Sequence, residues 1–387
     1  MKAIAFYLPQ FHPIPENDRW WGPGFTEWTN VAKGRPLFEG HYQPHIPADL
    51  GFYDLRLGET RIAQAKMAAQ YGVEGFCYYH YWFNGQLLLE KPAEAMVAEG
   101  QPDFPFCYCW ANETWSRRWD GQEHEILITQ DFARYDPSAH FEYLSSSFRD
   151  RRYIRISGKP LFLVYRIDQF PDICSTVKAW REAAAALGLP GIYLCAVRSH
   201  MHSLSDIETI ALGFDAIVGF EPHSRVLLRQ KTWACIRYLL PRSFNYLLRR
   251  LGLGRYFHER PVLHVFDYSK FVRKVMRAGK SAVRFFPCVI PSWDNSARRR
   301  SGATVIQNDD PVLFEAWLRN CAERVKDNPK DEQLVFINAW NEWAEGCHLE
   351  PDLRHGNRFL EAVARVFGTP HASQDLQDYA DRREHHG

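Results

Sequence analysis

The chain has 387 residues, of which 46% are hydrophobic and 24% are charged, so it is long and apolar enough to fold around a large core. Lys and Arg number 47 against 46 Asp and Glu, and a formal net charge of +1 gives no overall attraction to nucleic acid. Aromatic residues are the outlying group, with 13 Trp, 18 Tyr and 26 Phe. Because flat rings with a polar edge suit amphipathic ligands, this composition favours a carbohydrate ligand.

The cysteines and the N-terminal segment indicate a reducing compartment. Nine cysteines form no Cys-x-x-Cys pair, and most of them lie in apolar runs, which is typical of buried thiols. The apolar stretch from Ala3 to Pro9 is too short for a signal peptide, and no run of about 18 apolar residues predicts a transmembrane helix. We therefore expect a cytoplasmic protein.

Eight short runs rich in β-branched and aromatic residues predict the strands. Each run is continuously apolar, which is typical of a parallel sheet covered on both faces. The runs are residues 2–9, 73–82, 104–110, 160–166, 191–198, 215–221, 283–291 and 334–341. Helices are predicted between them, among others at residues 59–71, 172–187, 205–212 and 311–326. Eight strand–helix alternations predict a (β/α)8 barrel, and the absence of a GxGxxG or Walker motif disfavours an open doubly wound sheet.

Two insertions and a tail depart from a minimal barrel. Residues 11–58 form a long connection after the first strand, and such loops are usually functional. Residues 225–284 carry 15 Lys or Arg against two acidic residues and predict a basic helical insertion between strands 6 and 7. We assign residues 1–368 to one barrel domain and expect the polar residues 369–387 to form a disordered tail.

The basic insertion raises the question of a membrane contact. Within it, residues 233–257 interleave Trp, Phe, Tyr and Leu with arginines, a mixture that fits a helix lying in the membrane interface. This predicts peripheral docking on an anionic surface such as the inner membrane face. The alternative is a helical insertion whose leucines pack on the barrel and whose arginines are solvated.

The end of the eighth strand is the best candidate for catalysis, because barrel enzymes carry their chemistry where strands end. Glu342 and Glu345 follow this strand and are flanked by Trp340 and Trp343. If the chain turns helically after Asn341, both carboxylates point into one pocket. Burial would then make one of them an acid and leave the other a base, as glycoside cleavage requires. The alternative is a solvated helix face.

Other residues near strand ends are candidates for binding sugar faces and hydroxyls. They are His12, Trp20, Trp21, Trp28, His80, Tyr81, Trp110, Asn112, Glu113, Glu221, Trp293, Asp294, Asn295, Trp343 and Glu350. Each has a structural alternative: the carboxylates could form ion pairs, the tryptophans could pack the long loop, and Asp294-Asn295 could form a turn. We predict no metal and no cofactor, although His200 and His202 with His80, His223 and Asp294 would suit a metal-dependent hydrolase.

Several segments together resemble the WbsX-type glycosyltransferase family of bacterial surface-polysaccharide loci, which is related to the family 99 glycoside hydrolase barrels. The resemblance covers residues 1–367 and is carried by residues 6–12, 20–22, 25–29, 110–113, 291–295, 341–346 and 349–351. It implies a (β/α)8 barrel that makes or breaks an α-glycosidic bond with retention in O-antigen or capsule metabolism. The implied substrate is an oligosaccharide or a lipid-linked glycan.

The resemblance also implies roles for the two carboxylates. Family 99 hydrolases use a Glu-Trp-His-Glu segment in which one Glu takes the proton of the sugar's 2-hydroxyl, so that O2 attacks the anomeric carbon, and the other protonates the leaving oxygen. Glu342 then resembles the base and Glu345 the acid. Ala344 stands where the hydrolases carry His, which leaves hydrolysis and transfer both open. A glycan-binding protein without catalysis is the alternative from another class.

Overall fold

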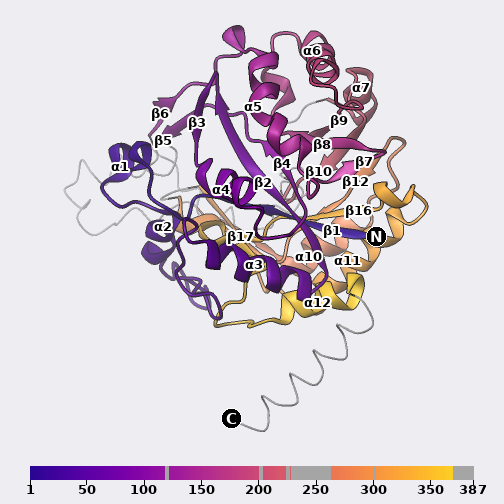
Figure 1. The fold of residues 1–387 in the computed structure, drawn as a ribbon. Helices are drawn as coiled ribbons and strands as arrows, with labels where there is room; N and C mark the ends of the chain where they lie inside the picture. The colour runs from indigo at the N-terminus through magenta and orange to yellow at the C-terminus, as the bar shows by residue number, and fades with distance from the viewer. Residues whose placement is uncertain (118–121, 200–203, 224–226, 228–262, 300–301, 369–387) are drawn as a thin grey trace, which may run out of the picture.

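The computed structural model describes residues 1–387 except 118–121, 200–203, 224–226, 228–262, 300–301 and 369–387. Its centre is a barrel of parallel strands (Figure 1). In barrel order these are β1 (Lys2–Tyr7), β2 (Val73–Phe83), β4 (Phe106–Trp110), β8 (Lys159–Val164), β9 (Tyr193–Arg198), β10 (Ala216–Gly219), β12 (Phe285–Phe286) with β13 (Cys288–Val289), and β16 (Leu334–Ile337). All eight predicted strands are present, and the predicted fold is confirmed.

The seventh predicted strand is divided into β12 and β13, and it closes the barrel. Pro287 separates the two pieces and has no N–H to donate to a ladder. β12 pairs with β10 on one side, and β13 pairs with β16 on the other. Because β16 also pairs with β1, the ring of strands is continuous.

Helices surround the barrel (Figure 1). They are α3 (Gly58–Gln70), α4 (Lys91–Glu99), α5 (Pro137–Arg149), α6 (Ile173–Ala186), α7 (Asp206–Ala211), α10 (Tyr268–Met276), α11 (Pro311–Val325) and α12 (Arg358–Phe367). Four of them match the predicted helices, and α7 begins with the predicted capping box of Ser205 and Glu208. Short 3₁₀ helices lie at Phe132–Arg134, Ile167–Gln169 and Lys330–Glu332.

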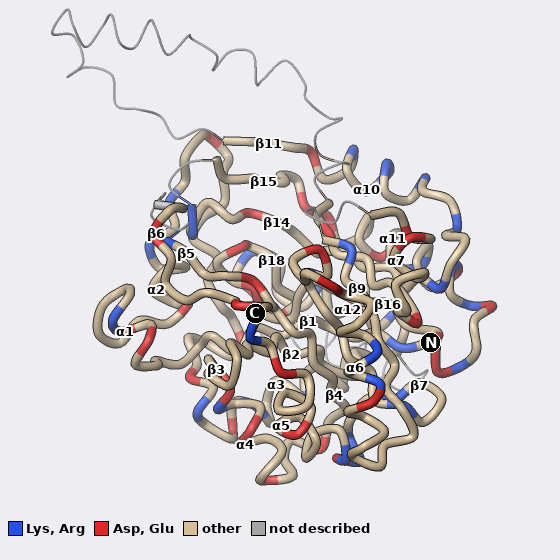
Figure 2. Tube along the Cα trace, turned by 90° about the horizontal axis from the view of Figure 1, so that it is seen from above, with Lys and Arg blue, Asp and Glu red and all other residues tan. Residues whose placement is uncertain are grey.

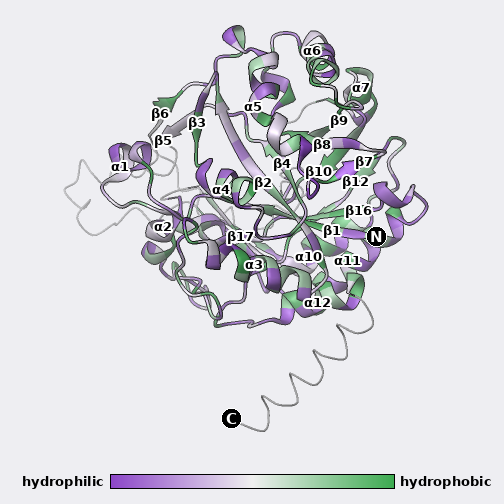
Figure 3. Ribbon diagram, in the orientation of Figure 1, coloured by the Kyte–Doolittle hydropathy of each residue, from purple (hydrophilic) through white to green (hydrophobic). Residues whose placement is uncertain are grey.

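Charge and hydropathy follow this layering. Charged residues lie mainly on the outer helices and loops (Figure 2), while the central strands are the most hydrophobic elements (Figure 3). Every residue of β4 and of β16 is buried. Both faces of these strands are covered, by the barrel interior and by the helices, which explains why their sequences do not alternate.

Short elements decorate the carboxyl ends of the barrel strands and build the rim. α1 (Pro15–Trp21) and α2 (Glu27–Lys33) lie in the long loop after β1. Two hairpins follow β4 and β16: β5 (Trp115–Arg117) with β6 (Gln122–Ile128), and β17 (Asn341–Glu342) with β18 (Cys347–His348). β3 (Gln86–Leu88) pairs with the end of β2 at the same rim, whereas β7 (Arg155–Ile156) pairs with the first residues of β8, at the amino ends of the barrel strands.

The described part of the basic insertion is not entirely helical, so this prediction is wrong for residues 263–267. They form β11 (Leu263–Asp267), which joins β15 (Ala303–Gln307) and β14 (Trp293–Asp294) in a separate three-stranded sheet. α10 supplies the helical part and carries basic residues (Figure 2), of which Lys270 and Arg273 are exposed. Residues 233–257 and the tail 369–387 lie outside the described residues. Among the described helices, each is too short or too polar to cross a bilayer.

Candidate active site

A tight hairpin after β16 carries the two predicted carboxylates. Between β17 and β18 the chain makes one 3₁₀ turn, Trp343–Glu345, that ends at Gly346 with φ 55°. A Cβ atom at Gly346 would lie 3.0 Å from both the backbone nitrogen and the Cβ of Asp294. Only glycine fits this combination of left-handed backbone and close approach. The helical turn predicted after Asn341 is therefore a single 3₁₀ turn packed against β14.

Buried hydrogen bonds fix this hairpin from behind. The Asn341 side chain accepts from the Leu8 N–H at 2.7 Å and donates to the Leu8 carbonyl at 3.0 Å, which ties the hairpin to the end of β1. Glu350 accepts from the Tyr53 hydroxyl at 2.7 Å and from the Trp343 indole at 2.6 Å. Glu350 and Trp343, two predicted binding residues, are thus buried supports of this turn.

One guanidinium connects the two carboxylates. Arg298 Nη2 lies 2.8 Å from Glu342 Oε2, and Nη1 lies 2.8 Å from Glu345 Oε1. Its Nε donates to Glu27 Oε1 at 2.7 Å. The side chain of Arg298 is 10% exposed and that of Glu27 is fully buried. Three carboxylates thus surround one cation in a site largely excluded from water.

The electrostatics of this cluster favour a bound proton. Burial, together with the neighbouring charges of Glu345 and Glu27, raises the pKa of Glu342 to about 8 against the opposing effect of Arg298. Burial also raises the pKa of Glu345, against Arg298. Because the two groups interact, the proton belongs to the pair rather than to one residue. At neutral pH the pair can therefore present one acid and one base.

A cavity of about 370 Å³ opens beside this pair, and aromatic side chains form part of its lining. Seven predicted site residues line it together: Trp21, Tyr81, Glu113, Trp293, Asn295, Glu342 and Glu345. Its size lies in the range of small-molecule sites, and rings beside polar groups suit sugar faces and hydroxyls. The structure therefore brings the predicted carboxylates and part of the predicted aromatic wall into one site.

The residues after β4 contribute one lining carboxylate and its supports. Glu113 lines the cavity and forms an ion pair of 2.6 Å with Arg166. Its position therefore agrees both with a binding residue and with a structural ion pair. Asn112 bonds both backbone groups of Arg166 and is buried. Trp110 is completely buried, and its indole donates to the Trp82 carbonyl at 3.2 Å.

Of the three tryptophans in the loop after β1, one belongs to the described residues that line the cavity. This is Trp21, with the Arg117 guanidinium 5.3 Å from its ring centre. Trp20 meets the edge of Trp115, which itself lines the cavity, at 5.9 Å. Trp28 packs against Trp343, with 5.7 Å between the ring centres, and so helps to pack the loop.

Four further candidates face away from this cavity. His12 is fully buried, and burial lowers its pKa to about 4. His80 contacts His140 of α5 at 2.8 Å, because alternation along β2 turns Tyr79 and Tyr81 into the cavity and His80 toward the helices. Asp294 is also buried, and burial raises its pKa, but hydrogen bonds from His41 and Gln43 hold it below its usual range.

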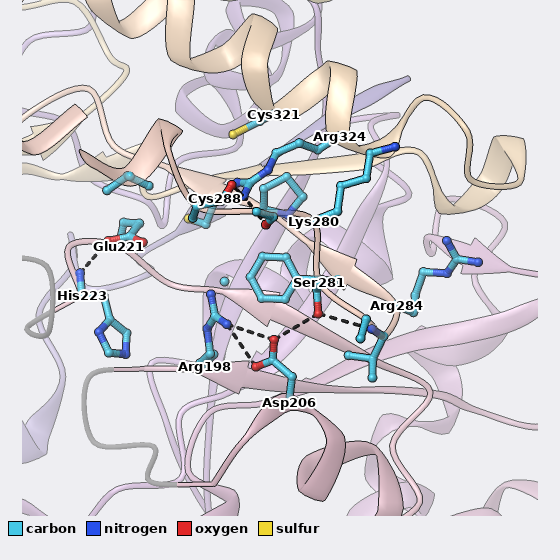
Figure 4. Close-up of a pocket in the computed structure, with 18 of the residues that line it drawn as sticks. Arg198, Asp206, Glu221, His223, Lys280, Ser281, Arg284, Cys288, Cys321 and Arg324 are labelled. Carbon is cyan, nitrogen blue, oxygen red and sulfur yellow. Dashed lines mark hydrogen bonds and ion pairs between the residues drawn. The ribbon is translucent and has the colours of Figure 1, made fainter. Parts of the chain in front are cut away.

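Glu221, the fourth, lies on the other side of β10. It lines a second cavity of about 730 Å³ with His223 (Figure 4). Its neighbours Phe220 and Pro222 line the first cavity instead. Burial raises the pKa of Glu221 to about 7, and its carboxylate accepts from the His223 N–H at 2.6 Å. The alternative metal set is not gathered in the described residues, since His80, His223 and Asp294 have these three separate surroundings. His200 and His202 lie outside the described residues.

Five residues that contact or line the site were not predicted from the sequence: Arg298, Glu27, Tyr79, Trp115 and Tyr165. Glu27 lies in the segment 25–29 that carries the family resemblance, which was an available signal. Tyr79 could have been paired with Tyr81 by strand alternation. Nothing local in the sequence distinguishes Arg298 from Arg299 and Arg300 next to it.

Comparisons with known proteins identify the family of this chain. The family model "Glycosyltransferase WbsX" matches residues 3–363. The chain belongs to this family. Two proteins named "Uncharacterized protein WxcX", from two strains of Xanthomonas campestris pv. campestris, are 41% and 40% identical to it over 368 residues. This match covers 94% of the chain and 49% of each relative, so the chain spans about half the length of these curated relatives.

Solved structures with the same fold include glycoside hydrolases. A "Glycoside hydrolase-like protein" aligns with a TM-score of 0.57 and 13% identity, covering 95% of this chain and 94% of its own. The GH99 endo-alpha-mannosidase from Bacteroides thetaiotaomicron aligns with a TM-score of 0.53 and 13% identity, covering 99% and 98%. These structures show the barrel fold. Together with the WbsX family they support a carbohydrate-active enzyme.

Proposed function

We propose that this WbsX-family chain makes or breaks an α-glycosidic bond with retention, using Glu342 and Glu345 as its acid–base pair. The main support is one observation: a single buried guanidinium, Arg298, joins both carboxylates beside an aromatic cavity at the carboxyl ends of the barrel strands. The substrate is an oligosaccharide or a lipid-linked glycan of bacterial O-antigen or capsule metabolism, handled at the cytoplasmic face of the inner membrane. The α linkage follows the GH99 endo-alpha-mannosidase that shares the fold.

The reaction requires two proton transfers in each half. In the first half, the base takes the proton of the 2-hydroxyl, O2 attacks the anomeric carbon, and the acid gives its proton to the leaving oxygen. In the second half, water or an acceptor hydroxyl attacks the same carbon and gives its proton to the former acid, while O2 regains a proton from the former base. Two inversions at one carbon amount to retention.

The exposure and acidity of the two residues bear on their roles. The side chain of Glu345 is 22% exposed against 7% for Glu342, which suits Glu345 for protonating a leaving group near the mouth of the cavity. The raised pKa of Glu342 runs against its role as base, because it holds a proton in the free enzyme. As base it must lose this proton when substrate binds, and Arg298 favours the charged form.

Two Glu→Gln variants test the proposal and the roles. With Glu345 as acid, Glu345→Gln lowers activity on natural glycosides by about 10²-fold or more and affects activated aryl glycosides less, because a good leaving group needs no proton. Glu342→Gln lowers both activities alike. Glu142→Gln on the exposed face of α5 is the matched control and leaves both unchanged.

The same variants separate the alternatives. If Glu342→Gln is the one rescued by activated leaving groups, the two roles are exchanged. Small and equal losses in both variants contradict the acid–base assignment. Saturable binding of oligosaccharides without turnover, unchanged by Glu342→Gln, would instead identify a glycan-binding protein. Adding acceptor oligosaccharides to an active enzyme and analysing the products distinguishes transfer from hydrolysis.

A further inference from the structure

A second cluster of ligating side chains lies behind the catalytic hairpin. His45 of the loop after β1, His348 of β18 and Asp352 shortly after it are all buried. His45 Nδ1 lies 2.9 Å from His348 Nε2, and each of these nitrogens lies 4.0 Å from Asp352 Oδ2. Among the described residues, these three are the His, Cys, Asp or Glu side chains whose ligand atoms lie close enough to one another to bind one ion.

Hydrogen bonds orient the ligand atoms toward one another. His348 Nδ1 donates to the Glu350 carbonyl at 2.9 Å, so its Nε2 carries the lone pair that faces His45. Metal-binding histidines are typically oriented in this way, with the second nitrogen bound to a carbonyl or carboxylate. Asp352 Oδ1 accepts from the backbone N–H groups of Arg354 and His355, which turns Oδ2 toward the two imidazoles.

The distances fit an ion after small shifts. Ligand atoms of a tetrahedral zinc ion with bonds of about 2.0–2.1 Å are about 3.3–3.4 Å apart. The observed separations of 2.9, 4.0 and 4.0 Å lie on both sides of this value. At 4.0 Å Asp352 Oδ2 is beyond hydrogen-bond distance of both imidazoles, so the direct contact between the histidines does not account for its position.

We propose that His45, His348 and Asp352 bind one divalent transition-metal ion of the zinc type. Two imidazoles and one carboxylate are the donor set that such ions prefer over Mg²⁺ or Ca²⁺. A water molecule completes the coordination. The site goes beyond the proposed glycosidic chemistry and does not depend on it.

The position of the site indicates a structural role. None of the three ligands is among the described lining residues of the cavity beside Glu342 and Glu345. The backbone segments on which they lie are already paired, since Ala48 N–H donates to the Pro351 carbonyl and Leu353 N–H to the Ile46 carbonyl. His348 also stacks on Trp343 of the catalytic turn at 3.7 Å. The ion therefore clamps the loop of residues 11–58 onto the catalytic hairpin.

Metal stoichiometry tests this site without an activity assay. The full chain is freed of metal with a chelator, incubated with ZnCl₂, dialysed, and analysed for zinc by mass spectrometry. Wild type is expected to retain one Zn²⁺ per chain, and its melting temperature to rise by about 5 °C with Zn²⁺. Asp352→Asn keeps the size and the Oδ1 acceptor but loses the anionic ligand, so it is expected to retain less than one tenth as much. His124→Asn on exposed β6 is the matched control and retains one equivalent.

Two further measurements protect the test against misfolding and nonspecific binding. His45→Asn is a second variant for the case that Asp352→Asn does not fold by circular dichroism. Co²⁺ bound to wild type is expected to give the visible absorption bands of a four-coordinate site, which needs no variant. Zinc binding by Asp352→Asn or His45→Asn that equals wild type would mean adventitious binding by surface histidines and would overturn the proposal. Failure of wild type to retain one equivalent would also overturn it.

Discussion

The guanidinium between the two carboxylates gives the sharpest test of how this site is held together. Arg298→Met keeps a long side chain and removes the charge, leaving Glu27 and Glu342 without their cation. Both contacts are buried, with side chains 0% and 7% exposed. Breaking a buried pair by removing one partner costs about 3–5 kcal/mol, because an uncompensated charge remains. The contact with Glu345 adds less, because that side chain is 22% exposed and better solvated.

The free energy of unfolding from urea titration at pH 8, where the carboxylates are more ionised, is the appropriate measurement. Arg319→Met, which removes an exposed pair with Glu315 on α11, is the matched control and should cost about 0.5 kcal/mol or less. The double variant Arg298→Met with Glu27→Gln should recover part of the loss, because the neutral amide needs no cation. A loss below about 1 kcal/mol for Arg298→Met, or a double variant whose loss equals the sum of the two single losses, would refute this reasoning.

Three other predictions concern the turn, the pH dependence of stability and the basic surface. Gly346→Ala should lower the unfolding free energy by about 1–3 kcal/mol more than Gly356→Ala. Both glycines have positive φ, but only at position 346 would the new Cβ press on Asp294. Equal losses of unfolding free energy in the two variants would contradict this. Because the pKa of Glu342 rises from about 4.5 in the unfolded chain to about 8, its stabilising contribution is complete below pH 4.5 and is lost as the pH rises to 8. The unfolding free energy of wild type should therefore fall over this pH window relative to that of Glu342→Gln. Parallel curves of unfolding free energy against pH for the two proteins would contradict the raised pKa. Vesicles rich in anionic lipid should float the protein at low ionic strength, and Lys270→Glu with Arg273→Glu on α10 should weaken this; equal flotation with neutral vesicles would exclude charge-driven docking.

The barrel could be predicted from the sequence because its strands are covered on both faces. Such strands appear as continuous apolar runs, and a run is visible without knowledge of its partner. The same property hides the direction of each side chain, so His80 was assigned to the site although it faces α5. β11 could not be predicted for a different reason. It is a strand because β15, from Ala303 to Gln307, pairs with it in parallel, and this partner lies 40 residues away in sequence.

The carboxylate pair could be predicted because its geometry is local, whereas its surroundings are not. Glu342 and Glu345 share one turn, but Glu27 reaches the same point from α2 and Arg298 from the segment after β14. Such convergence depends on the closed barrel, which brings the loops after β1, β13 and β16 to one rim. The sequence contains these residues but not their proximity.

This convergence also bears on the proposed reaction, in which a cation lies between the acid and the base. Arg298 engages Oε2 of Glu342 and Oε1 of Glu345, and each carboxylate has a second oxygen. A sugar hydroxyl or a glycosidic oxygen can therefore approach the second oxygen while the guanidinium stays in place, so binding does not require the ion pairs to break. The guanidinium lowers the cost of ionising either carboxylate, while burial favours a proton shared by the pair. Burial raises the pKa of both Glu342 and Glu345 against the charges of Arg298 and, at Glu345, of Arg299, so the cluster favours keeping one proton. In the proposed reaction, this proton is the one that the leaving group receives.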